Sequence, residues 1–277
     1  MRIKLSLVFA MGAIALSSVG CASETTSNDG EITGSTATSF EEWKKTVYQE
    51  SDTGIWIVDR DIPISSVEKL QSFYEQYVQQ GALIVDANNG VDSVWNATQK
   101  LNVTYCVSKS SFGSNYNRVV QAMNDAGNAW TAVANVKFVH KADQDGSCTV
   151  RNNKVVFNVR IGGSGFSGRA FFPNDGRSAR EVLIGPTAAN GSNPDGPESL
   201  TGLLRHELGH TLGFRHEHTR PESGATDCFE DNNWRELTQY DASSVMHYPW
   251  CNGANTGDLR ITALDAAGAA KLYGGPR

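Results

Sequence analysis

The stretch HELGHTLGFRHEH, residues 206–218, holds four of the six histidines in this 277-residue chain, with glutamates between them. His206 and His210 are four residues apart, a spacing that places both on one face of a helix. Two imidazoles placed in this way can bind one zinc ion. Glu207, beside them, can then reach a water on the metal rather than the metal itself. The residue types and spacing therefore indicate metal-assisted hydrolysis.

A third imidazole follows a glycine. Gly213 is a natural left-handed stop for the helix, and His216 comes three residues later, so a sharp turn can return His216 to the same metal. HExxH occurs by chance on exposed helices. HExxHxxGxxH specifies five positions, each with a role in binding the metal, activating water or ending the helix, so chance is a poor explanation for it. Three neutral imidazoles leave zinc its charge and an open position, which lowers the pKa of bound water.

A second short stretch, SSVMHYP at residues 243–249, adds candidate residues. Met246 fits either a core position or a turn beneath the metal. The hydroxyl of Tyr248 could stabilise an oxyanion. Glu217, directly after the third histidine, is either a surface residue or buried and hydrogen-bonded. We do not expect His218 or His247 to bind the metal, because three nitrogens and one oxygen satisfy zinc.

HELGHTLGFRHEHTRPE, with SSVMHYP downstream, resembles the metzincin zinc endopeptidases. It is most similar to the astacin-like branch and the bacterial HEIGH-type peptidases, with Leu208 in place of the isoleucine. The resemblance implies one catalytic zinc ion, protein or peptide substrates and a glutamate general base. The implied site comprises the zinc ligands His206, His210 and His216, the base Glu207, the Met-turn residue Met246, the branch glutamate Glu217 and the further ligand Tyr248.

The resemblance also implies an α+β, metzincin-type (zincin) fold over residues 96–277. Such a fold has a mixed twisted sheet and two long helices above the cleft, and a mostly irregular lower subdomain with a C-terminal helix. The sequence pattern agrees. It predicts helices over 115–134, 197–213 and 263–273, and strands over 101–108, 136–140, 154–162, 168–173 and 181–185. Gly168–Gly176 is our candidate for an exposed edge strand, because Pro173 limits its pairing.

The N-terminus is typical of an export signal, with Arg2 and Lys4 before a short apolar run and small residues. We interpret residues 1–21 as a signal peptide. Between plain secretion with cleavage near Ala22 and a bacterial lipoprotein with lipid on Cys21, we favour the lipoprotein. The protein would then be exported and either anchored at the outer membrane or cell surface, or secreted. Residues 22–39 are small and polar, which predicts a flexible linker.

Cysteine usage agrees with export. Apart from Cys21 there are four cysteines, an even number, as disulfides in an oxidising compartment require. Four cysteines allow three pairings. We expect the two sequential pairs, Cys106–Cys148 and Cys228–Cys251.

Residues 40–95 are too few for a confident core of their own, so we expect them to dock on the catalytic domain as a prosegment. A strand over 54–58 and a helix over 65–80, capped by Ser65 or Ser66, are predicted here. Astacin-like prosegments inhibit with an aspartate in a Phe-x-Gly-Asp pattern. VDRD, residues 58–61, is comparable, with Val58 and Arg60 replacing the Phe and Gly. Asp61 is either an inhibitory switch on zinc or a solvated aspartate that forms a turn or pairs with Arg60.

The formal net charge of −6 becomes −8 once Arg2 and Lys4 leave with the signal peptide, so no basic surplus favours nucleic acid. We expect a monomer that meets a membrane only through a lipid on Cys21. The rival to a peptidase is a non-catalytic surface module that keeps zinc for structure or ligand binding. Glu207 argues against that rival, because a structural site needs no base.

Overall fold

The computed structural model describes residues 40–45, 47–58, 61–74, 84–88, 90–191, 199–228, 230, 233–255 and 257–277. Residues 38–277 form one compact unit. The predicted signal peptide and linker, residues 1–39, lie outside the described residues. In the described parts, no helix is long and apolar enough to cross a membrane.

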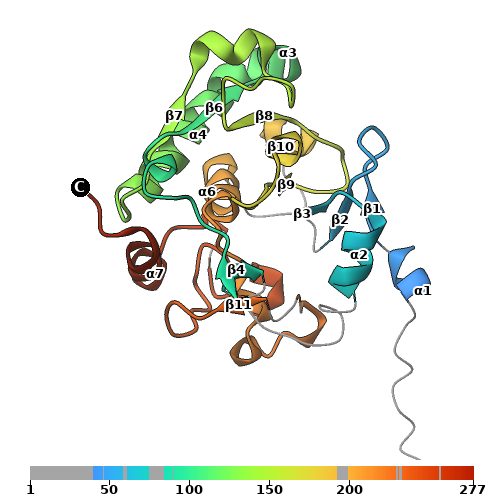
Figure 1. Cartoon of the computed structure of the whole chain (residues 1–277), viewed down its shortest axis with the longest axis vertical. Coiled ribbons are helices and arrows are strands. Elements are labelled where there is room, and N and C mark those ends of the chain that lie inside the picture. The colour runs from blue at the N-terminus through green and yellow to red at the C-terminus, as the bar shows by residue number, and fades with distance from the viewer. Residues whose placement is uncertain are drawn as a thin grey trace, which may run out of the picture. The chain divides into compact units, whose positions relative to one another are not determined.

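The upper half is built on a five-stranded sheet in the order β7-β6-β8-β10-β9 (Figure 1). The strands are β6 Val103–Val107, β7 Phe138–His140, β8 Phe157–Ile161, β9 Gly168–Arg169 and β10 Glu181–Ile184. Strands β7, β6, β8 and β10 are parallel, and β9 runs antiparallel to β10 at the edge of the sheet. Every residue of β6 and β10 is buried, as expected for strands covered on both faces. Each predicted strand therefore has a counterpart, although β9 covers only the first two residues of the strand predicted over 168–173, and β9 lies at an edge of the sheet.

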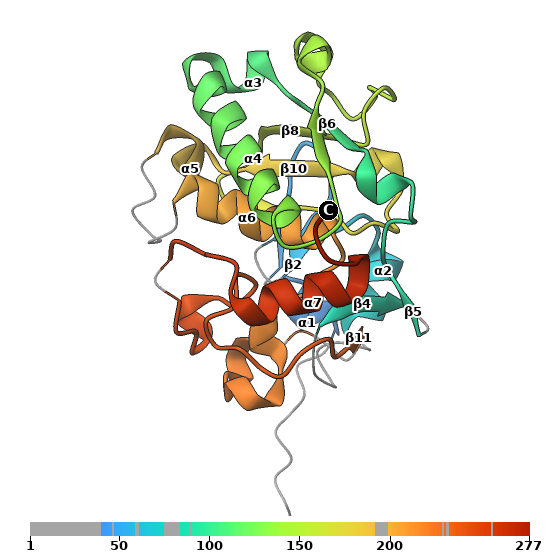
Figure 2. The same ribbon diagram turned by 90° about the vertical axis from the view of Figure 1, so that its left-hand side faces the viewer.

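Two long helices, α4 (Tyr116–Thr131) and α6 (Leu200–Thr211), pack against each other on one face of this sheet (Figures 1 and 2). Helix α4 buries Val119, Met123 and Trp130 at helical spacing. Helix α6 begins after Ser199, whose side chain accepts a hydrogen bond from the Gly202 amide at 2.9 Å. Residues 197 and 198, with which the predicted helix begins, lie outside the described residues. Short helices α3 (Lys109–Phe112) and α5 (Pro186–Asn190) complete the upper half.

The lower half has few regular elements before its last helix. Strand β11 (Trp234–Arg235) pairs with β4 (Val85–Asn88), and β4 pairs with β5 (Val91–Asp92). Helix α7 (Ala263–Tyr273) starts at the N-cap Thr262 in a capping box with Asp265. This irregular lower half and terminal helix match the expectation from sequence.

The N-terminal segment, residues 40–74, folds as helix α1 (Phe40–Lys44), an antiparallel sheet and helix α2 (Val67–Phe73). Its strands are β1 Tyr48–Gln49, β2 Trp56–Val58 and β3 Ile62–Ile64. Val58, Ile62, Ile64 and Leu70 form a small buried cluster, and Phe172 of the catalytic domain packs against it. The segment thus contacts the part of the chain that follows it, and its role as a prosegment stays a prediction. Its second helix is capped by Ser66, and the expected extension over residues 75–80 lies outside the described residues.

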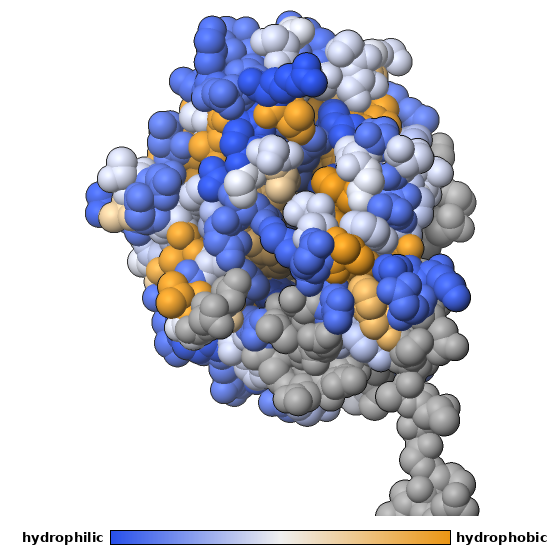
Figure 3. Space-filling model, turned by 45° about the vertical axis from the view of Figure 1, so that its right-hand side comes forward, coloured by the Kyte–Doolittle hydropathy of each residue, from blue (hydrophilic) through white to orange (hydrophobic). Residues whose placement is uncertain are grey.

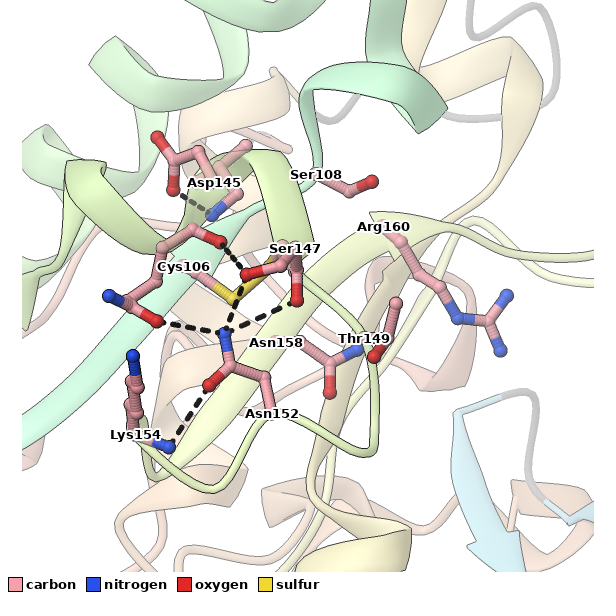
Figure 4. The surroundings of a disulfide bond; sticks show 12 residues. Cys106, Ser108, Asp145, Ser147, Thr149, Asn152, Lys154, Asn158 and Arg160 are labelled. Carbon is pink, nitrogen blue, oxygen red and sulfur yellow. Dashed lines mark hydrogen bonds between the residues drawn. A yellow bond between two sulfur atoms is a disulfide. The ribbon is translucent and has the colours of Figure 1, made fainter.

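Both sequential disulfides are present, which confirms the expected pairing. Cys106 of β6 is bonded to Cys148, which precedes β8 in the chain, and Figure 4 shows the surroundings of this disulfide. The Asn152 amide nitrogen stabilises the chain around Cys148 by donating to the Ser147 carbonyl at 3.2 Å. The face in Figure 3 carries its hydrophobic residues in small separate groups among hydrophilic ones, and no broad apolar patch is visible there.

Candidate metal centre

The three predicted ligands converge on one point. The Nε2 atom of His216 lies 3.0 Å from Nε2 of His206 and 3.2 Å from Nε2 of His210. His206 and His210 project from one face of α6, and all three side chains are buried. The leucines on the opposite face of the helix, Leu204 and Leu208, lie in the core. The helix period thus directs the imidazoles to the site and the leucines away from it.

The other nitrogen of each imidazole also has a partner. Nδ1 of His206 lies 2.8 Å from the Val245 carbonyl oxygen, and Nδ1 of His210 lies 2.8 Å from the Phe214 carbonyl oxygen. A carbonyl only accepts, so Nδ1 carries the proton in both rings and Nε2 keeps its lone pair for a metal. Nδ1 of His216 instead meets a carboxylate, that of Glu230.

The turn after α6 needs a glycine on two counts. Gly213 has φ +93°, and a Cβ there would lie 2.1 Å from the Ser93 carbonyl oxygen. The chain then runs beside β4, where the Arg215 amide donates to the Ile84 carbonyl at 2.8 Å and the Asp86 amide to the Gly213 carbonyl at 2.9 Å. This pairing returns the chain toward the metal centre, where His216 joins the other two imidazoles.

Met246 lies directly beneath the helix, in contact with a glycine whose role the sequence pattern does not reveal. A Cβ at Gly209 would lie 2.4 Å from the Met246 sulfur. The Met246 carbonyl accepts the amide of Glu217 at 2.9 Å. The small residue in HELGH thus lets this turn approach the ligand helix.

Glu217 is buried and hydrogen-bonded rather than exposed. Its Oε1 accepts the Asp241 amide at 2.9 Å and lies 3.2 Å from an Arg220 guanidinium nitrogen. Burial raises the pKa of the Glu217 carboxyl to about 8, although Arg220 acts in the opposite direction. Glu217 therefore ties the third ligand to the loop that leads into the Met246 turn.

Glu207 is 1% exposed, and its Oε2 has no hydrogen-bond partner among the described residues. Burial, and after it the charge of Asp61, raises the pKa of Glu207 well above its usual value. The backbone of β9 runs directly alongside, since a Cβ at Gly168 would lie 2.4 Å from Oε1 of Glu207. A buried carboxylate with a raised pKa and an unpartnered oxygen is suited to accept a proton from a reactant.

Asp61 caps the histidine triangle from one side. Its Oδ2 is 3.2, 3.3 and 3.0 Å from the Nε2 atoms of His206, His210 and His216, and the Tyr248 hydroxyl donates to the same oxygen. Burial alone would raise the pKa of Asp61. Coulombic interactions with His216 and His210, together with hydrogen bonds to His206 and His210, outweigh burial and hold this pKa well below the usual value. Arg60, the alternative partner, lies outside the described residues.

A second buried acid of the N-terminal segment holds the catalytic domain. Glu50 accepts two hydrogen bonds from Arg169 of β9, at 3.1 Å from Nε and 3.0 Å from Nη2. Arg169 is 0% exposed and Glu50 2%. Neither residue is marked in the sequence, because this pairing joins residues 119 apart and no local pattern indicates it.

A cavity of about 390 Å³ opens beside Glu207 and Asp61. Its wall includes Ser164–Gly168, Leu203, Tyr248 and Trp250. Trp250 is 45% exposed, and its ring stacks on that of Tyr248 with centroids 4.5 Å apart. The cavity is bordered by the candidate base and the candidate oxyanion donor, so a ligand in it would meet both.

The remaining histidines lie elsewhere or behind the ligands. His140 contacts Asp145 at 3.0 Å and stacks on Tyr105, away from the three converging imidazoles. Nε2 of His247 lies 2.9 Å from the Tyr240 hydroxyl. His218 stacks on Tyr248 and, with His216 and Glu230, forms a second group of side chains with metal-ligand spacing.

The donor set fits zinc. Asp61, His206, His210 and His216 each offer one ligand atom, and these atoms lie within 4.8 Å of one another. Three imidazole nitrogens and one carboxylate oxygen are ligands that zinc prefers, in a number that zinc accepts. The partners of the Nδ1 atoms orient the rings for the same ion.

Comparison with known proteins agrees with this geometry. Residues 57–224, more than half of the chain, match the family described as dual-action HEIGH metallo-peptidases. The chain belongs to this family. The metzincin-type zinc peptidase predicted from sequence is thereby confirmed, as is its α+β fold.

Curated relatives match parts of the chain, and one of them is a zinc metalloproteinase by name. Serralysin G of Dickeya chrysanthemi is 27% identical over 150 residues, which cover 53% of this chain and 31% of that protein. Protein SpAN of Strongylocentrotus purpuratus is 29% identical over 120 residues, covering 36% and 18%. Zinc metalloproteinase nas-30 of Caenorhabditis elegans is 38% identical over 64 residues, covering 17% and 9%. The chain thus spans less than a third of the length of these relatives.

Among the similar solved structures is that of high choriolytic enzyme 1, a hatching enzyme zinc-protease from Oryzias latipes. It is 18% identical with a TM-score of 0.42, and the match covers 65% of this chain and 96% of that one.

Proposed function

We propose that this chain is a zinc-dependent endopeptidase that hydrolyses peptide bonds in proteins. The observation that carries the proposal is the convergence of three buried imidazole Nε2 atoms beside a buried glutamate with an unpartnered oxygen. His206, His210 and His216 would hold one zinc ion. When bound, zinc polarises a substrate carbonyl and makes water more acidic.

The residues of the chain supply the proton transfers. Glu207 takes a proton from the attacking water and passes it to the amine nitrogen that leaves when the peptide bond breaks. Burial raises the pKa of this carboxyl, which makes its carboxylate a stronger base toward the water. The Tyr248 hydroxyl donates a hydrogen bond to the oxyanion that forms on the carbonyl. Substrate would add as a strand at the edge strand β9.

We further propose that the N-terminal segment keeps the enzyme latent. A carboxylate oxygen among the three imidazoles occupies the place that water needs, so Asp61 would inhibit while the segment stays docked. The buried pair Glu50–Arg169 gives the segment a second anchor. Because β4 pairs with β11 and supports the turn to His216, the removable part would end before Ile84.

One observation favours a second candidate, a non-catalytic zinc module. Structural zinc sites are closed by a fourth protein ligand, and Asp61 closes this one. The two candidates differ in the expected effect of removing the segment. A latent peptidase gains activity when Asp61 leaves, whereas a structural site loses a ligand and weakens.

A single assay separates the two. A specific protease site placed between Tyr74 and Ile84 allows the segment to be released from the purified protein, which is then tested on casein and a quenched peptide. Activity that appears after cleavage, disappears with a chelator and is absent in Glu207→Ala with zinc retained supports the peptidase. No activity after complete release, with zinc still bound, would contradict it.

The setting of this activity belongs to the same proposal. We infer that the protein is exported, with Cys21 lipidated and residues 22–39 as a tether, and that it acts as a monomer on protein substrates. Support comes from the signal-like residues 1–21 and from the two disulfides, which need an oxidising compartment.

A further inference from the structure

The three imidazoles differ in what holds their Nδ1 atoms. Backbone carbonyls hold His206 and His210, whereas the carboxylate of Glu230 holds His216. A carbonyl orients a ring and fixes its tautomer. A carboxylate does the same and also places a negative charge behind the ring, which makes the other nitrogen a stronger donor to a metal.

Glu230 is well fixed in its position. It is 2% exposed, and its second oxygen, Oε2, accepts a hydrogen bond from Arg215 at 3.0 Å. Arg215 directly precedes His216 and is itself buried. The Glu230 carboxylate therefore contacts His216 through one oxygen and Arg215 through the other.

A disulfide fixes the backbone beside it. Cys228, two residues before Glu230, is bonded to Cys251, three residues after Tyr248. The loop that carries Glu230 is thereby joined to the loop that carries the candidate oxyanion donor. His216 is not on α6 and lies where the chain has left regular structure, so its ring needs support from outside the helix.

We propose that Glu230 is the positioning residue for the third zinc ligand: it orients the His216 ring and raises its affinity for the metal, without touching substrate. This deepens the proposed function and rests on the zinc site at its centre. Glu230 differs from Glu217, whose contacts are with Arg220 and the Asp241 amide rather than with a ligand.

The same atoms define an alternative. His216, His218 and Glu230 have the spacing of metal ligands, so a second ion could use them. The direct contact between His216 Nδ1 and the Glu230 carboxylate argues against it, because an ion would have to lie between these two atoms. His218 Nε2 is 3.8 Å from the same oxygen, farther than a hydrogen bond.

The test measures zinc binding rather than activity. Zinc dissociation constants of the full chain are determined by competition with a chromophoric chelator for wild type, Glu230→Gln, Glu230→Leu and a matched control, Glu181→Gln. Glu181 is also buried and paired with an arginine, Arg160, on β8 of the sheet rather than at the metal. We expect Glu230→Gln and Glu230→Leu to weaken zinc binding about 10- to 100-fold, the usual cost of losing such a partner. Glu181→Gln should stay within about twofold of wild type.

Two further measurements separate positioning from folding. The melting temperature of the metal-free chain should fall by similar amounts in Glu230→Gln and Glu181→Gln, since each loses one buried charge pair. In the His216→Ala variant, the further change Glu230→Gln should alter the zinc dissociation constant by less than about twofold. Glu230 acts on zinc binding through the imidazole of His216, which this variant lacks.

Equal zinc affinity in Glu230→Gln and Glu181→Gln would overturn the proposal, as would two zinc ions per wild-type chain with the second lost in Glu230→Gln. A wild-type chain that binds no zinc would instead overturn the proposed function.

Discussion

Four buried acidic side chains surround the histidine triangle, and their partners give them different roles. Asp61 faces all three imidazoles, Glu230 faces one from behind, and Glu217 binds a guanidinium and an amide. Glu207, unlike Glu217 and Glu230, has a buried oxygen without a partner in the described residues and faces the cavity. The Oδ1 atom of Asp61 also lacks a partner among the described residues, and both side chains line the cavity, so a ligand there would meet both.

The role of the Tyr248 hydroxyl as an oxyanion donor can be tested with a single substitution. Its hydroxyl donates to Asp61, and its ring stacks on His206 with centroids 5.4 Å apart. With the segment released, Tyr248→Phe should keep zinc, because the stacking remains, and slow kcat by about one to three orders of magnitude, as for loss of one oxyanion donor.

Steady-state kinetics on a quenched peptide give the kcat of Tyr248→Phe, and a parallel measurement of metal content shows whether zinc is retained. An unchanged kcat would assign Tyr248 to packing alone.

Sequence could predict the three histidines, Glu207 and Gly213 as a set because each has a fixed place relative to one helix and its turn, whereas the role of Met246 was implied by the family resemblance. Glu230 escaped prediction because its contact with His216 depends on an irregular loop and a disulfide. A signal was nevertheless present: once Cys228 is paired with Cys251, the residue two places after Cys228 must lie near Tyr248.

The edge strand β9 is shorter than the sequence pattern predicts. The pattern predicts one strand over residues 168–173, yet β9 comprises only Gly168 and Arg169. The Phe172 amide donates a hydrogen bond to the Asp175 carboxylate at 2.9 Å, and Pro173 has no amide hydrogen to pair with a neighbouring strand. The turn therefore outcompetes the β propensity of two phenylalanines.

The docked N-terminal segment gives a prediction for the uncleaved chain. Asp61→Ala should give the uncleaved chain peptidase activity, because the carboxylate no longer occupies the place of water. Asp52→Ala is the control: it lies in the same segment with its side chain 68% exposed, and it should leave the chain inactive.

Both variants are assayed on a quenched peptide small enough to pass the segment, with and without chelator. Full activity of the uncleaved wild type would show that Asp61 does not inhibit.

The two disulfides should separate stability from zinc binding. Cys228 and Cys251 are 23 residues apart, so replacing both with serine should cost about 3 kcal/mol of unfolding free energy. The pair Cys106–Cys148, 42 apart, should cost about 4 kcal/mol. Only the first replacement should also weaken zinc binding, because only that disulfide holds the Glu230 loop.

Denaturant unfolding and chelator competition measure the two quantities. Equal zinc affinity in both double variants would separate the Cys228–Cys251 disulfide from the metal centre.

For the whole molecule, the acidic balance and the signal-like N-terminus lead to a prediction about its location. If Cys21 carries lipid, Cys21→Ser should move the protein from the membrane fraction to the soluble fraction or block its processing. Fractionation and then mass spectrometry of the mature N-terminus make the distinction. An unmodified N-terminus at Ser23 in the wild type would indicate plain secretion.

Tyr273, the last residue of α7, has a practical consequence for engineering the chain. Its hydroxyl donates to the Leu212 carbonyl at 2.6 Å and accepts the Trp95 amide at 3.3 Å, and the Trp95 indole donates to the Thr211 carbonyl at 2.7 Å. The carboxyl end of the ligand helix is thus clamped by a residue only four positions from Arg277. An affinity tag fused after the exposed Arg277 leaves this clamp intact, whereas a deletion that reaches Tyr273 frees the end of α6, one turn from His210.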